Sequence, residues 1–442
     1  MEQPFLHRIP PPEQLLSRQN SSWIDWITMF LLIGNTANPF FYQSVEMLFA
    51  SFMVLLVLWF LKEGTDTRLN KLFWIYVIVL TFLQVSQTLV YHFFPLKTFL
   101  GEYLRIAFAV TALRILGKDF FDRFVKFVYV FAVISLCFYI PCMLFKPLGP
   151  WLIDHVAKYM TAPFTRNNLE DVYISRYNMI IFNLGQITFH RNSGFYWEPG
   201  AHGGFLILAL FVNLFYRKEK WMSKFNIVFL VTILTTLSTT TYLSLFFVIL
   251  VYLKGFFIRR PWVSLFLALA LLGSAFLLYN KLEFLNEKIN KQIEKTEYGT
   301  PGESRFSSIL ADIRQLNEHP LIGTGRNEEM KYGKNFYNVE LKARHRNNGV
   351  GVLLGTYGIL FFFFFLYLNW RSFFKLLGDK VNAMMGLALL LIIGFSEDYF
   401  FKAFFIALVL FCGVTDIPPN RTRVIRSNKM QLGKNTPTYD QD

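Results

Sequence analysis

Apolar runs of about 18 to 22 residues recur along this chain, and each is long enough to cross the hydrocarbon core of a bilayer as a helix. Of the 442 residues, 54% are hydrophobic and 18% are aromatic, and the mean hydropathy is +0.36. A soluble domain of this length needs more polar surface than such a composition provides. The sequence therefore predicts an all-α integral membrane protein.

We expect about twelve transmembrane helices, in three groups separated by two long polar segments. Helices one to five occupy 23–145, helices six to nine occupy 198–279, and helices ten to twelve occupy 348–415. The first two form a tight hairpin around GNTANP, and the long apolar run after residue 224 is divided near Ser238. The predicted spans are 23–41, 44–61, 73–93, 97–116, 124–145, 199–216, one on each side of Ser238, 262–279, 348–368, 381–395 and 399–415.

Lys and Arg in the short loops predict the orientation of these helices, because such residues gather on the cytoplasmic side. Alternate loops carry nearly all of them, whereas the opposite short loops carry Lys97 or the acidic stretch SED at 396–398. The polar tail 1–22 and the basic tail 416–442 are therefore both expected in the cytoplasm. The two long segments, 146–197 and 280–347, are then external, and the second contains short amphipathic helices at 280–299 and 303–320.

Charge, cysteine content and missing motifs exclude several classes of function. The net charge of +14 comes from basic residues scattered in short loops, with no zinc-finger, RNA-binding or helix-turn-helix pattern, so we expect no nucleic-acid partner. Cys137, Cys142 and Cys412 lie in apolar runs, which predicts neither disulfides nor a cysteine metal site. HExxH, P-loop, GxSxG and dinucleotide motifs are absent and the seven histidines are dispersed, so no metal and no cofactor is expected.

The stretch RNSGFYWEPGAHGGFL, residues 191–206, joins the first external segment to an apolar run. Pro199 suits the first helical turn, which places Glu198 at the N-cap, where the helix dipole favours a carboxylate. His202 follows one turn later on the same face, so the two side chains suit general-base chemistry. Arg191 adds a positive charge at the membrane edge. The alternative is a capped membrane helix with an interfacial arginine.

A second basic cluster precedes the apolar run that begins at residue 348. Arg344, His345 and Arg346 stand just before a helix N-terminus, whose free N–H groups favour anions, and guanidinium groups bind phosphate through two contacts. Arg305 lies at the start of the helix predicted at 303–320. Basic groups in two external segments predict a substrate with phosphate or pyrophosphate, a leaving group that needs no metal once its charge is neutralised. Helix anchoring, and an ordinary surface histidine at position 345, are the alternatives.

Two further pairs of charged residues have competing interpretations. Glu397 and Asp398 form either a turn signal between the last two spans or a supplementary acid, and we prefer the turn. Glu102 and Arg105 lie three residues apart in the fourth span. Because a charged side chain at the bilayer centre costs about 2.5–3.5 kcal/mol on insertion scales, we expect an intramembrane pair or a headgroup contact rather than exposure to lipid.

Two motifs together resemble the O-antigen polymerase and O-antigen ligase superfamily of polytopic glycosyltransferases. RNSGFYWEPGAHGGFL is similar to the R-x-x-G-x-x-x-E-P-G stretch of repeat-unit polymerases, and EHPLIGTGRN followed by RNNGVGVLLGTYGILF is similar to the second signature of the superfamily. The resemblance covers about 185–370 and is otherwise topological. Asn347 and Asn348 stand where His-Asn is usual, with His345 two positions earlier, and Ser238-Thr239 replaces a frequent Ser-Arg. Both changed positions belong to the pattern that is typical of ligases. Their absence here favours a polymerase.

The resemblance implies a multi-pass enzyme of the bacterial cytoplasmic (inner) membrane whose active site faces the periplasm. It would polymerise undecaprenyl-pyrophosphate-linked oligosaccharide for O-antigen, capsule or exopolysaccharide, with membrane lipid and, optionally, a chain-length regulator as further partners. Glu198, with His202 or His345, would deprotonate the acceptor. The groups expected to bind pyrophosphate or glycan are Arg191, Arg305, Arg344, Arg346 and Asn347. The alternatives are a ligase that transfers glycan to lipid A core, and a flippase or other transporter of lipid-linked oligosaccharides.

Overall fold

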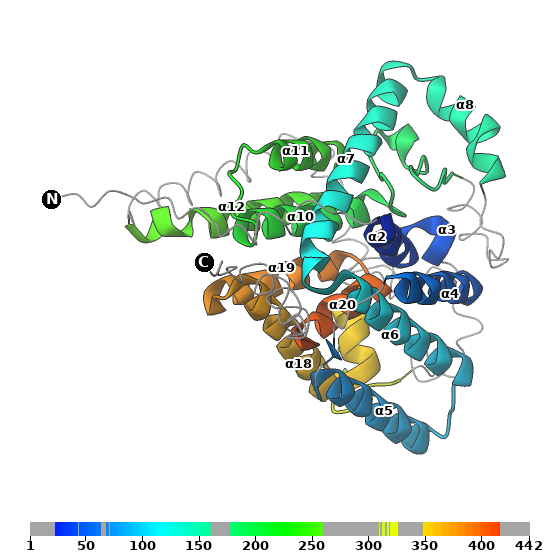
Figure 1. The fold of residues 1–442 in the computed structure, drawn as a ribbon, viewed down its shortest axis with the longest axis vertical. Coiled ribbons are helices and arrows are strands. Elements are labelled where there is room, and N and C mark those ends of the chain that lie inside the picture. Colours follow the sequence, from blue (N-terminus) through cyan, green and yellow to red (C-terminus); the bar gives the residue numbers. More distant parts are fainter. Residues whose placement is uncertain are drawn as a thin grey trace, which may run out of the picture.

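The computed structural model describes residues 23–42, 44–62, 68–69, 71–160, 177–259, 309, 312–313, 316–317, 319–325 and 348–415, which are mostly helical (Figure 1). Its two-residue strands β1 and β2 pair antiparallel. The elements are α2 (Trp23–Ala37), α3 (Pro39–Tyr42), α4 (Val45–Leu61), β1 (Arg68–Leu69), α5 (Lys71–Tyr91), α6 (Leu96–Leu116), η1 (Gly117–Asp119), α7 (Phe120–Leu144), α8 (Leu148–His155), η2 (Ala157–Tyr159), η3 (Ile187–Phe189), α10 (Pro199–Phe215), α11 (Lys224–Thr236), α12 (Thr239–Arg259), α18 (Gly349–Leu377), α19 (Lys380–Ser396), α20 (Ala403–Leu410), η5 (Phe411–Gly413) and β2 (Val414–Thr415).

Three helical stretches of the described chain are long and apolar enough to cross a membrane: α5, the stretch Leu96–Leu144 that contains α6 and α7, and α18. Shorter apolar helices include α4, α10, α11 and α19. Large hydrophobic side chains on α5 point away from the protein, with Phe82 74% and Leu89 69% exposed. Exposed apolar surface of this extent is typical of a face that contacts lipid. These features are consistent with a membrane protein.

Most helices lie where the apolar runs predict them, and one predicted span differs in an informative way. The break expected near Ser238 is present, because α11 ends at Thr236 and Leu237 adopts a left-handed conformation with φ 47°. The last predicted span, 399–415, contains only an eight-residue helix, α20, because the chain turns between Glu397 and Lys402 before the helix begins. The predicted span 262–279 and the amphipathic helix 280–299 lie outside the described residues.

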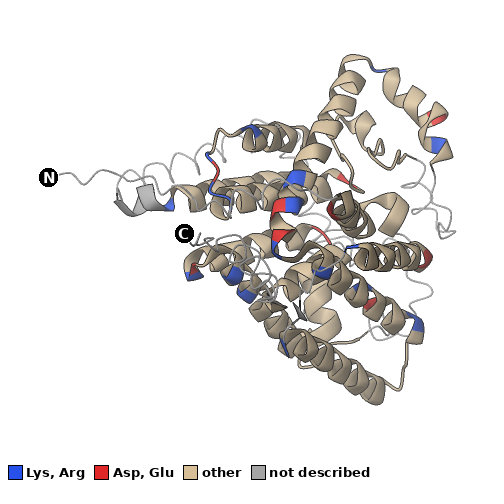
Figure 2. Cartoon of the chain, viewed as in Figure 1, with Lys and Arg blue, Asp and Glu red and all other residues tan. Residues whose placement is uncertain are grey.

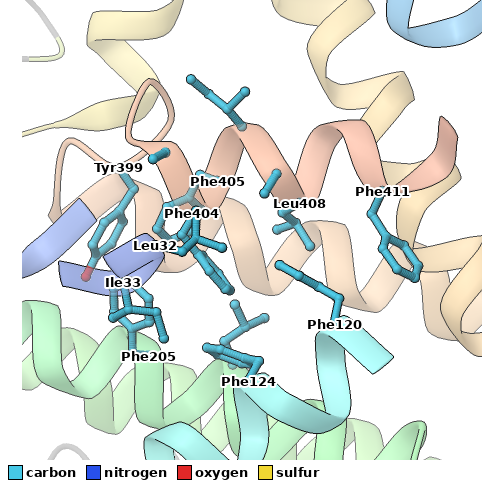
Figure 3. Close-up of a cluster of buried hydrophobic side chains, with 14 of the residues drawn as sticks. Leu32, Ile33, Phe120, Phe124, Phe205, Tyr399, Phe404, Phe405, Leu408 and Phe411 are labelled. Carbon is cyan, nitrogen blue, oxygen red and sulfur yellow. The ribbon is translucent and has the colours of Figure 1, made fainter. Parts of the chain in front are cut away.

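Helix α20 forms the centre of the hydrophobic core (Figure 3). All eight of its residues are buried, and Phe404 packs against Phe120 of α7 and Phe205 of α10, with ring centroids 5.6 and 5.3 Å apart. The N–H of Phe404 donates to Thr36 Oγ1 at the end of α2 (2.8 Å), which satisfies a backbone group that the start of a helix leaves free. A short helix therefore suffices here, since its neighbours rather than lipid surround it.

A cluster of charged residues joins one set of helix ends, and the charges of the described chain lie mostly near helix ends (Figure 2). Asp25 at the start of α2 accepts from Lys62 after α4 (2.5 Å) and lies 3.2 Å from Arg123 at the start of α7. Asp122 pairs with Arg217 just after α10 (3.2 Å). These contacts place the C-terminal end of α10 beside the start of α2, so the N-terminal end of α10 lies at the opposite end of the helices.

Helix α18 is broken at Gly358, whose φ of 76° and ψ of 175° are not helical. The PLIGTG turn packs into this break. The N–H of Ile359 donates to the carbonyl oxygen of Pro320 (2.9 Å), and the N–H of Thr324 donates to that of Gly355 (2.8 Å). Gln87 of α5 donates to the carbonyl oxygen of Thr356 (2.8 Å). The turn thus supplies partners for backbone groups that the helix itself leaves free.

We expect Gly358→Ala to destabilise the protein more than Gly378→Ala, by about 2 kcal/mol or more. Both glycines have positive φ, but a Cβ on Gly358 would stand 2.3 Å from the carbonyl oxygen of Leu321, whereas a Cβ on Gly378 meets nothing within 4 Å. Titration of the two purified variants with denaturant in detergent measures the difference in their free energies of unfolding. Equal losses would show that backbone strain, and not the docked turn, makes glycine necessary at Gly358.

Candidate functional site

Glu198 stands at the start of α10, where the sequence places it, but its carboxylate does not cap the helix. The backbone at Glu198 is extended (φ −151°, ψ 165°), Pro199 occupies the first turn, and the carboxylate makes no bond to the N–H groups of that turn. Its Oε1 instead lies 3.1 Å from the point where a Cβ on Gly200 would stand. The side chain is half-buried. The carboxylate therefore lies beside the first turn of α10 without capping it.

A second carboxylate, that of Glu397, points at the same place from the turn between α19 and α20. Glu397 is 6% exposed, and its Oε1 lies 2.7 Å from the Cβ position of Gly200. Its Oε2 accepts a hydrogen bond from Trp197 Nε1 (3.2 Å). Glu397 lies in a turn, as the sequence predicts. The contact of its side chain with Trp197, about 200 residues away in the sequence, is not predicted. Two carboxylates therefore meet above the first turn of α10.

The start of α18 lies at the same turn, so the two sequence motifs come together. A Cβ on Gly349 would stand 2.5 Å from the carbonyl oxygen of Glu397 and 3.2 Å from Cα of Asp398. Asn348 caps α18, and its Oδ1 accepts from the N–H of Gly351 (2.9 Å). The N-terminal ends of α10 and α18 thus both pack against the Glu397 turn. Helix N-termini favour nearby negative charge, so both helix ends offset part of the charge of the carboxylates that meet at this turn.

Arg191 and His202 hold the loop that precedes α10. Arg191 Nε donates to the carbonyl oxygen of Thr236, beside the break between α11 and α12 (3.3 Å). His202 is 1% exposed, its ring stacks on Tyr196 at 5.1 Å, and its Nδ1 donates to the carbonyl oxygen of Asn192 (3.3 Å). A Cβ on Gly194 would stand 2.5 Å from the imidazole. The imidazole is therefore packed inside the loop, which suits a positioning role.

Buried asparagines that belong to neither sequence motif fix the rest of this loop. Asn38 Nδ2 donates to the carbonyl oxygen of Phe195 (2.7 Å), and Asn183 Nδ2 donates to those of Tyr196 (2.9 Å) and Trp197 (3.0 Å). Buried amide groups need partners, and here they find them in an irregular backbone that no helix or strand satisfies. The only sequence signal is an isolated asparagine beside aromatic residues, which is too common to be specific.

Glu102, inside the predicted fourth span, has neutral partners on neighbouring helices. Gln84 Nε2 of α5 donates to its Oε2 (2.7 Å), and the hydroxyl of Tyr357 in α18 donates to its Oε1 (2.6 Å). Glu102 is 2% exposed, so exposure to lipid is avoided as the sequence predicts. The remaining predicted site residues lie outside the described residues: Arg305, Arg344, His345, Arg346 and Asn347.

Comparison with known proteins adds no assignment. No protein-family model and no curated protein matches the chain.

Proposed function

We propose that the protein is a polymerase of lipid-linked oligosaccharide repeat units. It would transfer an undecaprenyl-pyrophosphate-linked glycan to the terminal sugar hydroxyl of another lipid-linked unit. The proposal rests on the sequence motifs and on one structural observation: the carboxylates of Glu198 and Glu397 meet at Gly200, beside the N-terminal ends of both motif helices. A base and an anion-binding environment side by side are what such a transfer needs.

The proposed chemistry uses groups of the chain alone. Glu198 accepts the proton of the acceptor hydroxyl, and the oxygen of that hydroxyl forms a bond to the anomeric carbon of the donor sugar. The bond from that carbon to the pyrophosphate breaks, and undecaprenyl pyrophosphate leaves with the electron pair. Arg191 and the two helix N-termini favour the developing negative charge, and we assign the same task to Arg305, Arg344 and Arg346. Asn347 would bind the glycan, and His202 or His345 would assist the base.

The proposed arrangement in the membrane follows the distribution of basic residues. Twelve spans, with both termini in the cytoplasm, place 146–197 and 280–347 outside the inner membrane of a bacterium. The charge pairs at the start of α2 and the end of α10 then lie on the cytoplasmic side, and Glu198 lies on the periplasmic side. The contact of the α10 and α18 ends at Glu397 supports this arrangement, because it needs both motifs on one side.

Lipid-linked repeat units given to the purified protein in lipid nanodiscs test the proposal. We expect longer chains to form without a second acceptor and in the presence of a metal chelator. Arg191→Ala should abolish these chains while the amount of protein in the membrane stays unchanged. Chains that transfer only after lipid A core is added would make the protein a ligase, and units that cross the bilayer unchanged would make it a transporter.

A further inference from the structure

A short row of half-buried side chains lies beside the paired carboxylates. Trp197 and Tyr42 have ring centroids 5.5 Å apart, and Lys402 Nζ lies 5.0 Å from the centroid of Tyr42. These three residues, which we call the aromatic strip, come from the end of α3, the loop before α10 and the turn before α20. Each keeps part of its surface exposed. The strip therefore offers aromatic surface beside Glu198 and Glu397.

The polypeptide holds Trp197 rigidly in this place. Its backbone N–H donates to the carbonyl oxygen of Ala37 (3.0 Å), and its own carbonyl oxygen accepts from Asn183 (3.0 Å). The indole Nε1 donates to Glu397 (3.2 Å), and the ring lies 5.7 Å from that of Tyr399. Two contacts fix the backbone and two fix the indole, so the side chain loses little freedom when a ligand binds, which favours affinity.

These contacts argue against a simple membrane anchor. Interfacial tryptophans anchor helices by keeping the ring in the apolar boundary while the indole N–H faces water or headgroups. Here the N–H of Trp197 is directed inward to a carboxylate that is 6% exposed. With its single donor used, Trp197 can offer a ligand only the surface of its ring. The ligand that fits must have an apolar face and, at its edge, polar groups that reach carboxylates and an ammonium group.

We propose that the aromatic strip binds the terminal sugar of the acceptor glycan, an inference that rests on the proposed function. A pyranose ring has an apolar face of C–H groups, which packs on aromatic rings, and a rim of hydroxyl groups, which donate to carboxylates. A sugar stacked on Trp197 brings its hydroxyl groups to the side where Glu198 and Glu397 meet. Lys402, at the other end of the strip, supplies donors for sugar oxygens.

Binding of the free repeat-unit oligosaccharide tests the strip separately from catalysis. The probe is the oligosaccharide released by mild acid from the lipid-linked pool of the source cells, titrated calorimetrically into the full-length protein in nanodiscs. We expect Trp197→Ala to weaken binding by about tenfold or more, and Trp197→Phe, which keeps a ring, by about threefold or less. Trp221→Ala is the matched control, because Trp221 is also half-buried but packs on Tyr252, away from Glu198. The Trp221→Ala protein should bind the oligosaccharide as the parent does.

The outcomes separate the inference from the proposed function. If binding depends on Trp197 but the protein makes no polymer, the sugar-binding role of the aromatic strip is supported and the proposed polymerase function is overturned. Polymer made with the same acceptor KM by the parent protein and by Trp197→Ala overturns the strip. Equal losses in Trp197→Ala and Trp197→Phe also overturn it, because only the bond to Glu397 would then matter. If Trp197→Ala fails to fold, Tyr42→Leu, which keeps the apolar volume without a ring, must weaken binding for the inference to stand.

Discussion

Glu198→Gln is expected to lower kcat of polymerisation by about 10² to 10⁴-fold, with a similar amount of protein in the membrane. The amide has the shape of the carboxylate but cannot accept a proton at neutral pH. Glu198 does not cap α10, so its replacement leaves the hydrogen bonds of the helix start intact. Chain lengths formed from lipid-linked repeat units in nanodiscs, under single-turnover conditions, measure the effect on the transfer step.

Two matched variants make the Glu198 result specific. Glu46→Gln changes an exposed carboxylate in the first turn of α4, and should leave the rate unchanged. Glu397→Gln keeps an oxygen that can accept from Trp197 Nε1 and removes one of the two facing charges. For Glu397→Gln we expect a decrease in kcat that is larger than that of Glu46→Gln and smaller than that of Glu198→Gln. A Glu198→Gln protein that makes long chains at a rate close to that of the parent would exclude Glu198 as the base.

Asp25→Ala is expected to reduce the free energy of unfolding by about 3 kcal/mol, because it leaves the buried Arg123 and the partly buried Lys62 without their shared partner. Asp25 is 4% exposed and contacts both Lys62 (2.5 Å) and Arg123 (3.2 Å), so one substitution affects α2, α4 and α7 together. Titration of the purified protein with SDS, followed by tryptophan fluorescence, measures the loss.

The pair of Asp122 and Arg217 is the control for Asp25. The side chain of Asp122 is 38% exposed and that of Arg217 is 17% exposed, so solvent screens the interaction and Asp122→Ala should cost less than about 1 kcal/mol. Replacing Asp25, Lys62 and Arg123 together by apolar residues should recover most of the stability, since no buried charge then remains unpaired. If the triple variant is as unstable as Asp25→Ala, packing rather than charge explains the loss.

Helix positions were largely predictable from the sequence because apolar length is a local property. The starts and ends of α5, α6, α7 and α10 fall within a few residues of the predicted spans. The break at Leu237 follows from a run too long for one helix that contains a cluster of serine and threonine. The sequence does not predict the break at Gly358, since the run 348–368 has no charged residue or proline and the groups that satisfy the break belong to residues 320–325.

The candidate site divides in the same way. The Arg191 to His202 motif stands out as a candidate site because its residues are adjacent, and Pro199 identifies the helix start. The sequence favours a turn at Glu397 and Asp398, since acidic residues at the end of a helix are usually no more than that. Its contact with Gly200 and Trp197 joins residues about 200 positions apart.

By itself, the sequence determined that the chain forms apolar helices, where most of them begin, and which charged residues stand at the start of α10. Those properties depend on the order of neighbouring residues and on the length of each apolar run. The tertiary structure alone decided that α20 is short and enclosed, that the PLIGTG turn fills the break in α18, and that Glu397 faces Glu198. Such contacts depend on which helices pack together, and side chains far apart in the chain determine that packing jointly.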